Sequence, residues 1–142
     1  MTLVARMLPV AVLLVSAPVA HAQQSPDERA VREVVGAYFG GHATAIADTM
    51  RSAFLPTAPI EGIRNGAFSS WTVDQYVAGF RGQPAADEAT RARTIDVVDV
   101  TGSAAMVKAT LKHGATTFTD YFVLLKVDGA WKIANKVYHA QR

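Results

Sequence analysis

The side chains in this sequence that could do acid–base chemistry belong to a tyrosine and three aspartates: Tyr38, Asp48, Asp99 and Asp120. A tyrosine hydroxyl can donate a hydrogen bond to a carbonyl oxygen while a carboxylate removes a proton from the neighbouring carbon. No local motif selects one aspartate for this role. Tyr38 also fits a core position with its hydroxyl at the rim, and Asp48 fits a solvated helix face. These four residues are therefore individual candidates for catalysis, and no sequence motif joins them.

A second set of residues could line a ligand pocket. Asn135 follows the alternation of Trp131 and Ile133, which places its amide on the buried side of a strand. A buried amide needs partners, and ligand pockets are mostly apolar with a few polar groups. Trp71 could line the mouth of such a cavity or anchor the helix that follows it. The predicted pocket consists of Tyr38, Trp71, Trp131 and Asn135.

Several other chemistries have no support in the sequence. It contains no cysteine, no Gly-x-Ser-x-Gly and no phosphate-binding glycine loop. His113 and His139 fall at the same end of the predicted sheet, but no HxxxH, HxH or HExxH spacing is present, so no metal site is predicted. The formal net charge is +2 without a basic run, which argues against nucleic acid as a partner. We expect no cofactor.

The C-terminal part of the chain predicts a β-hairpin. Two alternating apolar runs flank an Asp-Gly pair at positions 128 and 129. A bulged loop over residues 128–130 places Val127 opposite Trp131, which buries bulky residues together. A two-residue loop would shift the register by one and place Trp131 opposite Lys126. We predict the bulged loop.

This register sorts the polar residues of the hairpin by face. Asn135 lies on the cavity side, whereas Asp120, Phe122 and Lys136 lie on the outer face of the sheet. Asp120 and Lys136 are then diagonal neighbours, and we interpret them as a cross-strand ion pair rather than as ligand contacts.

The N-terminus has the pattern of a secretory signal peptide. Arg6 precedes an apolar run over residues 7–20, and Ala20-His21-Ala22 is a small-x-small cleavage site. The alternative is an uncleaved membrane anchor. We expect a signal peptide over residues 1–22, a periplasmic or secreted protein without membrane association after cleavage, and a single domain over residues 23–142.

The sequence after the leader predicts helices followed by strands. Ser25 to Glu28 is a capping box that starts a first helix, which Gly40 and Gly41 should stop. A second helix is expected over residues 42–53, a hairpin within residues 58–70, and a third helix from Val73. Strands are expected over residues 95–100, 104–112, 117–127 and 131–139. This order predicts an α+β domain with helices packed on one face of a curved antiparallel sheet.

The segment FTDYFVLLKVDGAWKIANKVYH at residues 118–139 resembles the closing strands of the lumazine-binding-like family in the nuclear-transport-factor-2-like superfamily. The end of the first helix at Tyr38-Phe39-Gly40-Gly41 and the Trp71-Thr72-Val73 segment are similar too. The resemblance implies a cone-shaped α+β barrel around three helices, with a cavity open at one end. It also implies a homodimer through the outer sheet face, here the side predicted to carry Asp120, Phe122 and Lys136. Members often have a histidine where this chain has Leu55.

Three hypotheses for function follow. The first is non-catalytic binding of a small planar or aromatic molecule in an apolar pocket. The second is a cofactor-independent isomerase, dehydratase or cyclase that uses a tyrosine donor and a carboxylate base. The third is a dimerisation module whose cavity is filled by its own side chains. A pocket in which Tyr38 and a carboxylate converge would favour the enzyme.

Overall fold

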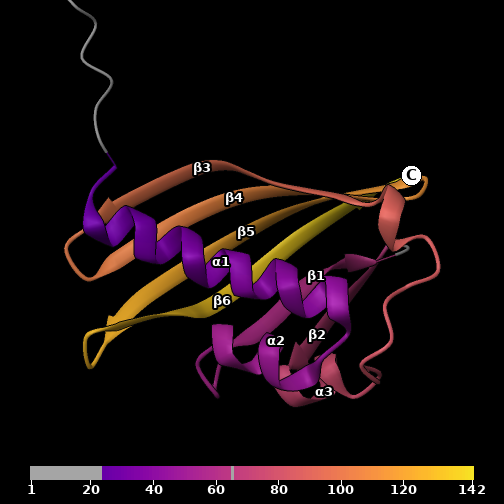
Figure 1. Cartoon of the computed structure of the whole chain (residues 1–142), viewed down its shortest axis with the longest axis horizontal. Helices are drawn as coiled ribbons and strands as arrows, with labels where there is room; N and C mark the ends of the chain where they lie inside the picture. Colours follow the sequence, from indigo (N-terminus) through magenta and orange to yellow (C-terminus); the bar gives the residue numbers. More distant parts are fainter. Residues whose placement is uncertain (1–23, 65) are drawn as a thin grey trace, which may run out of the picture.

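A computed structural model describes residues 24–64 and 66–142, so the predicted signal peptide lies outside the described residues. The chain runs through α1 (Pro26–Thr44), α2 (Ala47–Ala53), β1 (Pro59–Arg64), β2 (Ala67–Thr72), α3 (Val73–Val77), a 3₁₀ turn η1 (Glu88–Thr90), β3 (Ala92–Thr101), β4 (Ala104–His113), β5 (Thr116–Val127) and β6 (Ala130–Gln141) (Figure 1). The described part holds no helix that is long and apolar enough to cross a membrane.

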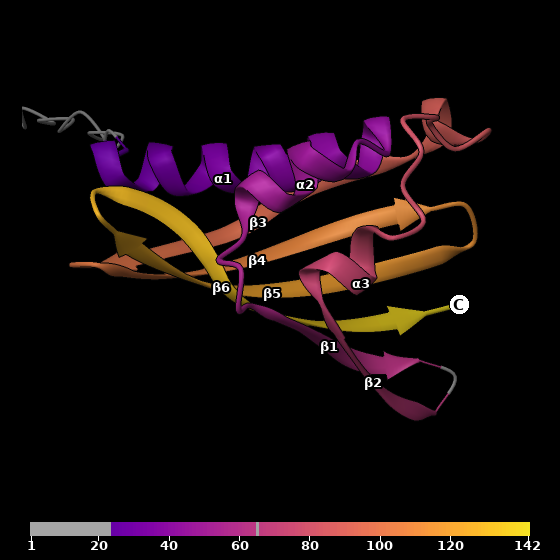
Figure 2. The same cartoon turned by 90° about the horizontal axis from the view of Figure 1, so that it is seen from below.

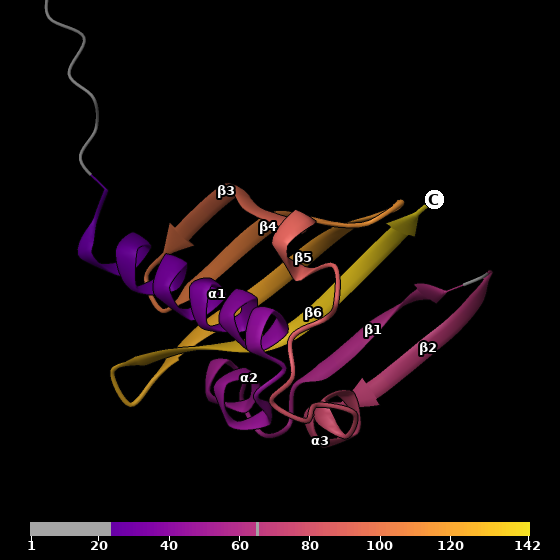
Figure 3. The same cartoon turned by 45° about the vertical axis from the view of Figure 1, so that its right-hand side comes forward.

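One curved six-stranded sheet carries the fold. Its strand order is β2-β1-β6-β5-β4-β3, and every neighbouring pair is antiparallel except β1 and β6, which are parallel. Helix α1 crosses one face of the long strands, and α2 and α3 lie towards the β1–β2 hairpin (Figures 2 and 3). The predicted α+β class, with helices on one face of a curved sheet, is confirmed.

The core lies between α1 and the inner face of the sheet. Alternate residues of each long strand point inward, as the period of two requires. The buried apolar side chains include Val31, Val35, Met50, Phe54, Ile60, Val107, Leu111, Phe122, Leu124 and Ile133. These contacts hold the inner face of β5 and β6 against the helix that carries Tyr38.

Helix α1 is longer than predicted. Ser25 caps its first turn, because the backbone N–H of Glu28 donates to Ser25 Oγ at 3.0 Å. Gly40 and Gly41 do not stop it, and the helix continues to Thr44. A Cβ on Gly41 would lie 2.9 Å from Met50, so this glycine permits close packing of α2 instead of ending α1.

The register predicted for the β5–β6 hairpin is wrong. Asp128 and Gly129 have φ values of 50° and 79° and form a two-residue turn, so Lys126 pairs with Trp131. Positive φ at both central residues is the type I′ geometry that an Asp-Gly pair favours. A shift in pairing further along leaves Ala134 without a partner, and beyond it Val123 pairs with Asn135 and Phe122 with Lys136.

The register and the bulge together reverse the predicted faces. Asp120, Phe122 and Lys136 are buried on the inner face, not exposed on the outer one. Asn135 pairs with the exposed Val123, on the outward side of the sheet. The bulge at residue 134 is decisive, because it moves Lys136 to the same face as Trp131 and Ile133.

Candidate functional site

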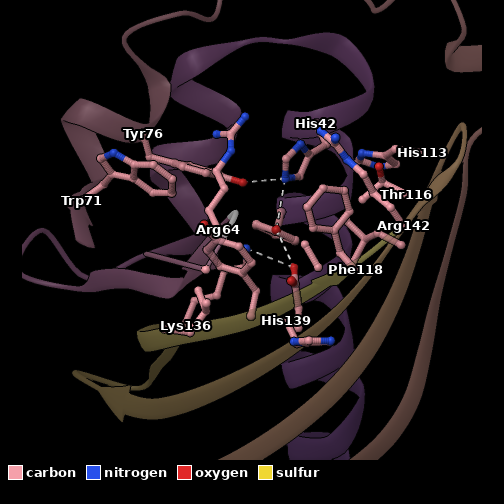
Figure 4. A pocket seen from close by; sticks show the side chains of 17 residues that line it. His42, Arg64, Trp71, Tyr76, His113, Thr116, Phe118, Lys136, His139 and Arg142 are labelled. Carbon is pink, nitrogen blue, oxygen red and sulfur yellow. Dashed lines mark hydrogen bonds and ion pairs between the residues drawn. The ribbon is translucent and has the colours of Figure 1, made fainter. Parts of the chain in front are cut away.

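A cavity of about 560 Å³ lies between the end of α1, helix α3 and the inner face of the sheet (Figure 4). Its aromatic lining comes from Tyr38, Trp71, Tyr76, Phe118 and Tyr138. Its polar lining includes His42, Arg64, His113, Asp120, Lys136 and Arg142. Because Arg64 and Arg142 are exposed, the cavity reaches the surface on their side. Its size suits a small molecule.

Tyr38, Asp120 and Lys136 form a buried cluster at the wall of this cavity. The Tyr38 hydroxyl donates to Asp120 Oδ2 at 2.7 Å, and Lys136 Nζ lies 3.2 Å from the same oxygen. The three residues are only 0 %, 1 % and 3 % exposed. Burial, and after it the neighbouring Tyr76 and the Asp120 carboxylate, hold the pKa of Tyr38 well above its ordinary value, so this tyrosine keeps its proton.

Aromatic rings surround the ammonium group of Lys136. Its Nζ lies 5.2 Å from the ring centre of Tyr38, 5.5 Å from that of Tyr76 and 4.8 Å from that of Tyr138. Cation–π contacts of this kind stabilise an ammonium group that has lost its water. The rings and the carboxylate of Asp120 together explain how a lysine can be buried here.

His42 links this cluster to Tyr76 on α3. His42 Nε2 lies 3.0 Å from the Tyr38 hydroxyl and 2.9 Å from the Tyr76 hydroxyl (Figure 4). Burial lowers the pKa of His42 well below its ordinary value, with a smaller contribution from the charge of Lys136. The imidazole is therefore neutral and carries one N–H.

The tautomer of His42 decides the directions of its two hydrogen bonds. Tyr38 has one proton, which it donates to Asp120. With the hydrogen on Nε2, His42 donates to the oxygens of both Tyr38 and Tyr76, and this is the tautomer in which both contacts of Nε2 are hydrogen bonds. We infer that the Tyr76 hydroxyl keeps its own proton available for a molecule in the cavity.

Two buried polar atoms of the cavity-lining residues have no partner among the described residues. They are Asp120 Oδ1 and His113 Nε2. An unsatisfied buried acceptor is costly, and in a functional site such an atom is a candidate ligand contact. Asp120 thus has one oxygen held by Tyr38 and Lys136 and one buried oxygen without a partner among the described residues, which a ligand would reach only by entering deep into the cavity.

The structure brings together part of the predicted pocket. Tyr38 and Trp71 line the cavity, but Trp131 and Asn135 do not. Trp131 is buried nearer the start of β6, where its indole N–H donates to Asp27 at 3.0 Å. Asn135 lies on the outward side of the sheet, so its prediction as a cavity residue is wrong. Ligand contact by Tyr38 and Trp71 stays a prediction.

The structure also separates the candidate aspartates. Asp48 is exposed on α2 and pairs with Arg51, and Asp99 is exposed on β3. Neither lines the cavity, whereas Asp120 does. Asp120 is thus the only predicted carboxylate that converges with Tyr38.

Sequence reasoning missed His42 and Tyr76. The predicted end of the first helix at Gly40 and Gly41 separates His42 from Tyr38, and helical spacing on the third helix favours a packing role for Tyr76. Once α1 continues, the spacing of four residues between Tyr38 and His42 places both on one helix face. That spacing was the available signal. No third ligand joins the histidines, and no group of metal-binding side chains occurs within the described ranges.

Comparisons with known proteins agree with this fold. A family model described as "Putative lumazine-binding" matches residues 26–139. NTF2-like proteins of unknown function from Shewanella baltica OS155 and Methylobacillus flagellatus KT are similar in structure. The first is 25 % identical with a TM-score of 0.73 and covers 84 % of this chain and 99 % of its own. The second is 26 % identical with a TM-score of 0.73, covering 85 % and 97 %.

The chain belongs to the lumazine-binding-like family, whose solved relatives have the nuclear-transport-factor-2-like fold. A curated relative, "Aldolase FrzH" from Cladobotryum sp, is 27 % identical over 92 residues, which span 63 % of this chain and 72 % of that protein. A shared fold of this kind does not by itself assign an activity.

Proposed function

We propose that the cavity binds a small planar carbonyl compound and that the protein moves a proton at the carbon beside the carbonyl group. The observation that carries this proposal is the 2.7 Å hydrogen bond between Tyr38 and Asp120 at the wall of an open cavity. It joins a carboxylate with a free oxygen to a chain of donors that ends at Tyr76.

The residues divide the reaction between them. The unpaired Oδ1 of Asp120 takes the proton, the electron pair of the broken C–H bond forms a C=C bond, and the π pair of the carbonyl group moves onto its oxygen. The Tyr76 hydroxyl donates a hydrogen bond to that oxygen, and the nearby ammonium group of Lys136 stabilises its developing negative charge. Return of the proton to another carbon completes an isomerisation. In a dehydration, a hydroxyl group on the next carbon leaves as water with the proton held by Asp120; in an aldol reaction, the enolate carbon attacks a second carbonyl group, whose oxygen takes that proton.

The relative named an aldolase supports this chemistry, because aldol reactions begin with a nucleophilic carbon beside a carbonyl group. The family description supports a ligand of planar, aromatic type. Aromatic walls at Trp71, Phe118 and Tyr138 suit such a ligand.

Deuterium incorporation tests the proposal. Phenylpyruvate, which has an aromatic ring, a carbonyl group and an acidic CH₂, is incubated in D₂O with the protein and followed by NMR. We expect faster exchange of the CH₂ protons, reduced by about 10²-fold in Asp120→Asn, because a positioned base contributes at least that much. Exchange at the buffer rate, or an unchanged rate in Asp120→Asn, would contradict proton transfer.

Binding without catalysis is the second candidate. The ion pair favours it, because Tyr38 and Lys136 already engage one oxygen of Asp120 in a buried contact within the protein itself. Phenylpyruvate that binds to the protein but exchanges its CH₂ protons no faster than in buffer would favour binding without catalysis. The third hypothesis, a filled cavity, does not fit the open volume of about 560 Å³.

We also propose export and dimerisation for this protein. The leader-like pattern of residues 1–22 supports a periplasmic or secreted location, which Edman sequencing of protein recovered outside the cytoplasm would test. A homodimer through the outer sheet face is supported by its exposed apolar side chains: Val97, Met106, Tyr121, Val123, Leu125 and Val137. Asp120, Phe122 and Lys136 take no part in that face, since they are buried inside.

A further inference from the structure

We propose that the ligand of this cavity is a carboxylate, whose anionic group is bound by Arg64 and Arg142 at the mouth while its planar part lies among the aromatic side chains. This inference rests on the part of the proposed function that makes the cavity a ligand site. It does not depend on proton transfer, and it names the class of ligand.

The side chains that line the cavity carry an excess of positive charge. Among the described lining residues, Asp120 is the only one with an acidic side chain, and Lys136 neutralises it at 3.2 Å. Counting side chains alone, Arg64 and Arg142 are then in excess, and Arg64 carries this excess most clearly because Arg142 is the last residue of the sequence. A cavity with unbalanced positive charge and aromatic walls favours an anion over a neutral molecule of the same shape.

The guanidinium groups of Arg64 and Arg142 have no partner among the residues that the structure describes. Among residues 24–64 and 66–142, no hydrogen bond or ion pair engages the side chain of Arg64 or Arg142. Residues 1–23 and residue 65 contain no aspartate or glutamate, so no acidic side chain outside the described part could pair with them. By contrast, Arg91 and Arg93 near the same cavity are paired with Asp87 and Glu88.

The electrostatic potential inside the cavity also favours an anion. Burial, and after it the charges of Arg91 and Arg93, lower the pKa of His113 to about 4, although Glu88 and Asp87 act in the opposite direction. The charge of Lys136 also helps to lower the pKa of His42. Both imidazoles are therefore neutral in a positive field, which an anionic ligand would offset.

The arrangement of aromatic rings and arginine side chains in the cavity also suits a planar acid. The rings of Trp71 and Tyr138 are parallel within 2°, with centres 6.3 Å apart, and they stand beside the mouth. Figure 4 shows the side chains of Arg64 and Arg142 on either side of His42. A guanidinium group binds a carboxylate through two parallel hydrogen bonds, which is the match that a planar acid offers.

Two matched pairs of probes test the inference by titration calorimetry with the full mature chain. Phenylpyruvate is compared with phenylacetone, in which a methyl group replaces the carboxylate, and 2-naphthoate with 2-acetonaphthone. We expect the acid of each pair to bind about 10- to 100-fold more tightly, the range of a charge-assisted hydrogen bond. Binding of the acids should weaken with added salt.

Arg64→Met should remove most of this preference, because it should weaken binding of the acids far more than binding of the neutral ketones. The control is Arg81→Met, because Arg81 is exposed and does not line the cavity. Both arginines are at the surface, so these variants should fold.

Equal affinities within each pair, or an unchanged preference in Arg64→Met, would overturn the carboxylate assignment and leave ligand binding intact. Failure of all four compounds to bind would overturn both proposals. A preference for acids without deuterium exchange would support the carboxylate assignment and contradict only the proton transfer.

Discussion

Asp120 and Lys136 are both charged and almost fully buried, and each explains why the other is tolerated. Removing one partner from a buried ion pair leaves an uncompensated charge, whereas replacing both by apolar residues can be neutral. Tyr38 adds a hydrogen bond to the same carboxylate. For this buried pair, replacing one residue should therefore lower the free energy of unfolding much more than replacing both, which is not expected of an exposed pair.

We expect Lys136→Met to lower the free energy of unfolding by about 3–5 kcal/mol, because it leaves the Asp120 carboxylate unpaired. Asp120→Leu should cost a similar amount. The double variant Asp120→Leu/Lys136→Met should recover most of the loss in urea unfolding. Additive losses in the double variant would show that the two side chains are not coupled.

The lowered pKa of His113 predicts how stability depends on pH. The unfolded histidine binds a proton below about 6.5, whereas the folded one does so only below about 4. The unfolded state therefore holds more protons in this window, so the free energy of unfolding should fall as the pH drops from 6.5 to 4. His42 contributes in the same direction.

Urea unfolding at a series of pH values checks this expectation. His113→Gln should give a flatter dependence over the window, since glutamine does not titrate. The surrounding charges of Asp87, Glu88, Arg91 and Arg93 stay in place in this variant. An identical slope in His113→Gln would contradict the assignment.

At the scale of the elements, two features position the site. The continuation of α1 to Thr44 places His42 beside Tyr38, and the bulge at residue 134 turns Lys136 inward. A third feature is the close approach of β6 to β1. A Cβ on Gly62 would lie 2.5 Å from the ring of Tyr138, so that ring lies flat against the glycine.

Gly62→Ala should therefore displace the ring of Tyr138 and lower the free energy of unfolding by about 1–3 kcal/mol. The double variant Gly62→Ala/Tyr138→Leu should be less destabilised than Gly62→Ala alone, because the smaller and more flexible leucine side chain can move away from the added Cβ. Gly79→Ala is the matched control, since nothing lies within 4 Å of its added Cβ. A neutral Gly62→Ala in thermal unfolding would contradict this packing.

Most elements could be predicted from the sequence, but the faces of the last hairpin could not. Strong alternation and an Asp-Gly pair fixed β5, β6 and the position of their turn. The loop length and the bulge at residue 134 depend on tertiary packing, and a slip of one residue exchanges the two faces of a strand. The sequence therefore indicates Tyr38 and Asp120 as candidate residues, but it does not predict the hydrogen bond between them.

At the scale of the whole molecule, the sheet has two apolar faces. The inner face packs on α1, and the outer face exposes residues such as Met106, Tyr121 and Val123. An exposed apolar face of this kind marks an interaction surface. A second copy of the chain would bury it.

We expect the protein to be a dimer in sedimentation equilibrium, and Val123→Glu to shift it to a monomer, because the charge would be buried at the interface. The matched control is Ile46→Glu, which places the same charge on an exposed isoleucine at the start of α2. A monomeric wild-type protein would contradict the dimer.

We propose above that a ligand in the cavity contacts Asp120 and Tyr76 inside it and the arginines at its mouth. A crystal structure with phenylpyruvate tests it most directly. We expect the ring beside Trp71, the carbonyl oxygen within hydrogen-bond distance of the Tyr76 hydroxyl, the CH₂ carbon facing Asp120 Oδ1 and the carboxylate on Arg64. A probe bound outside the cavity, or inside it with its carbonyl group away from both Tyr76 and Asp120, would contradict the claim.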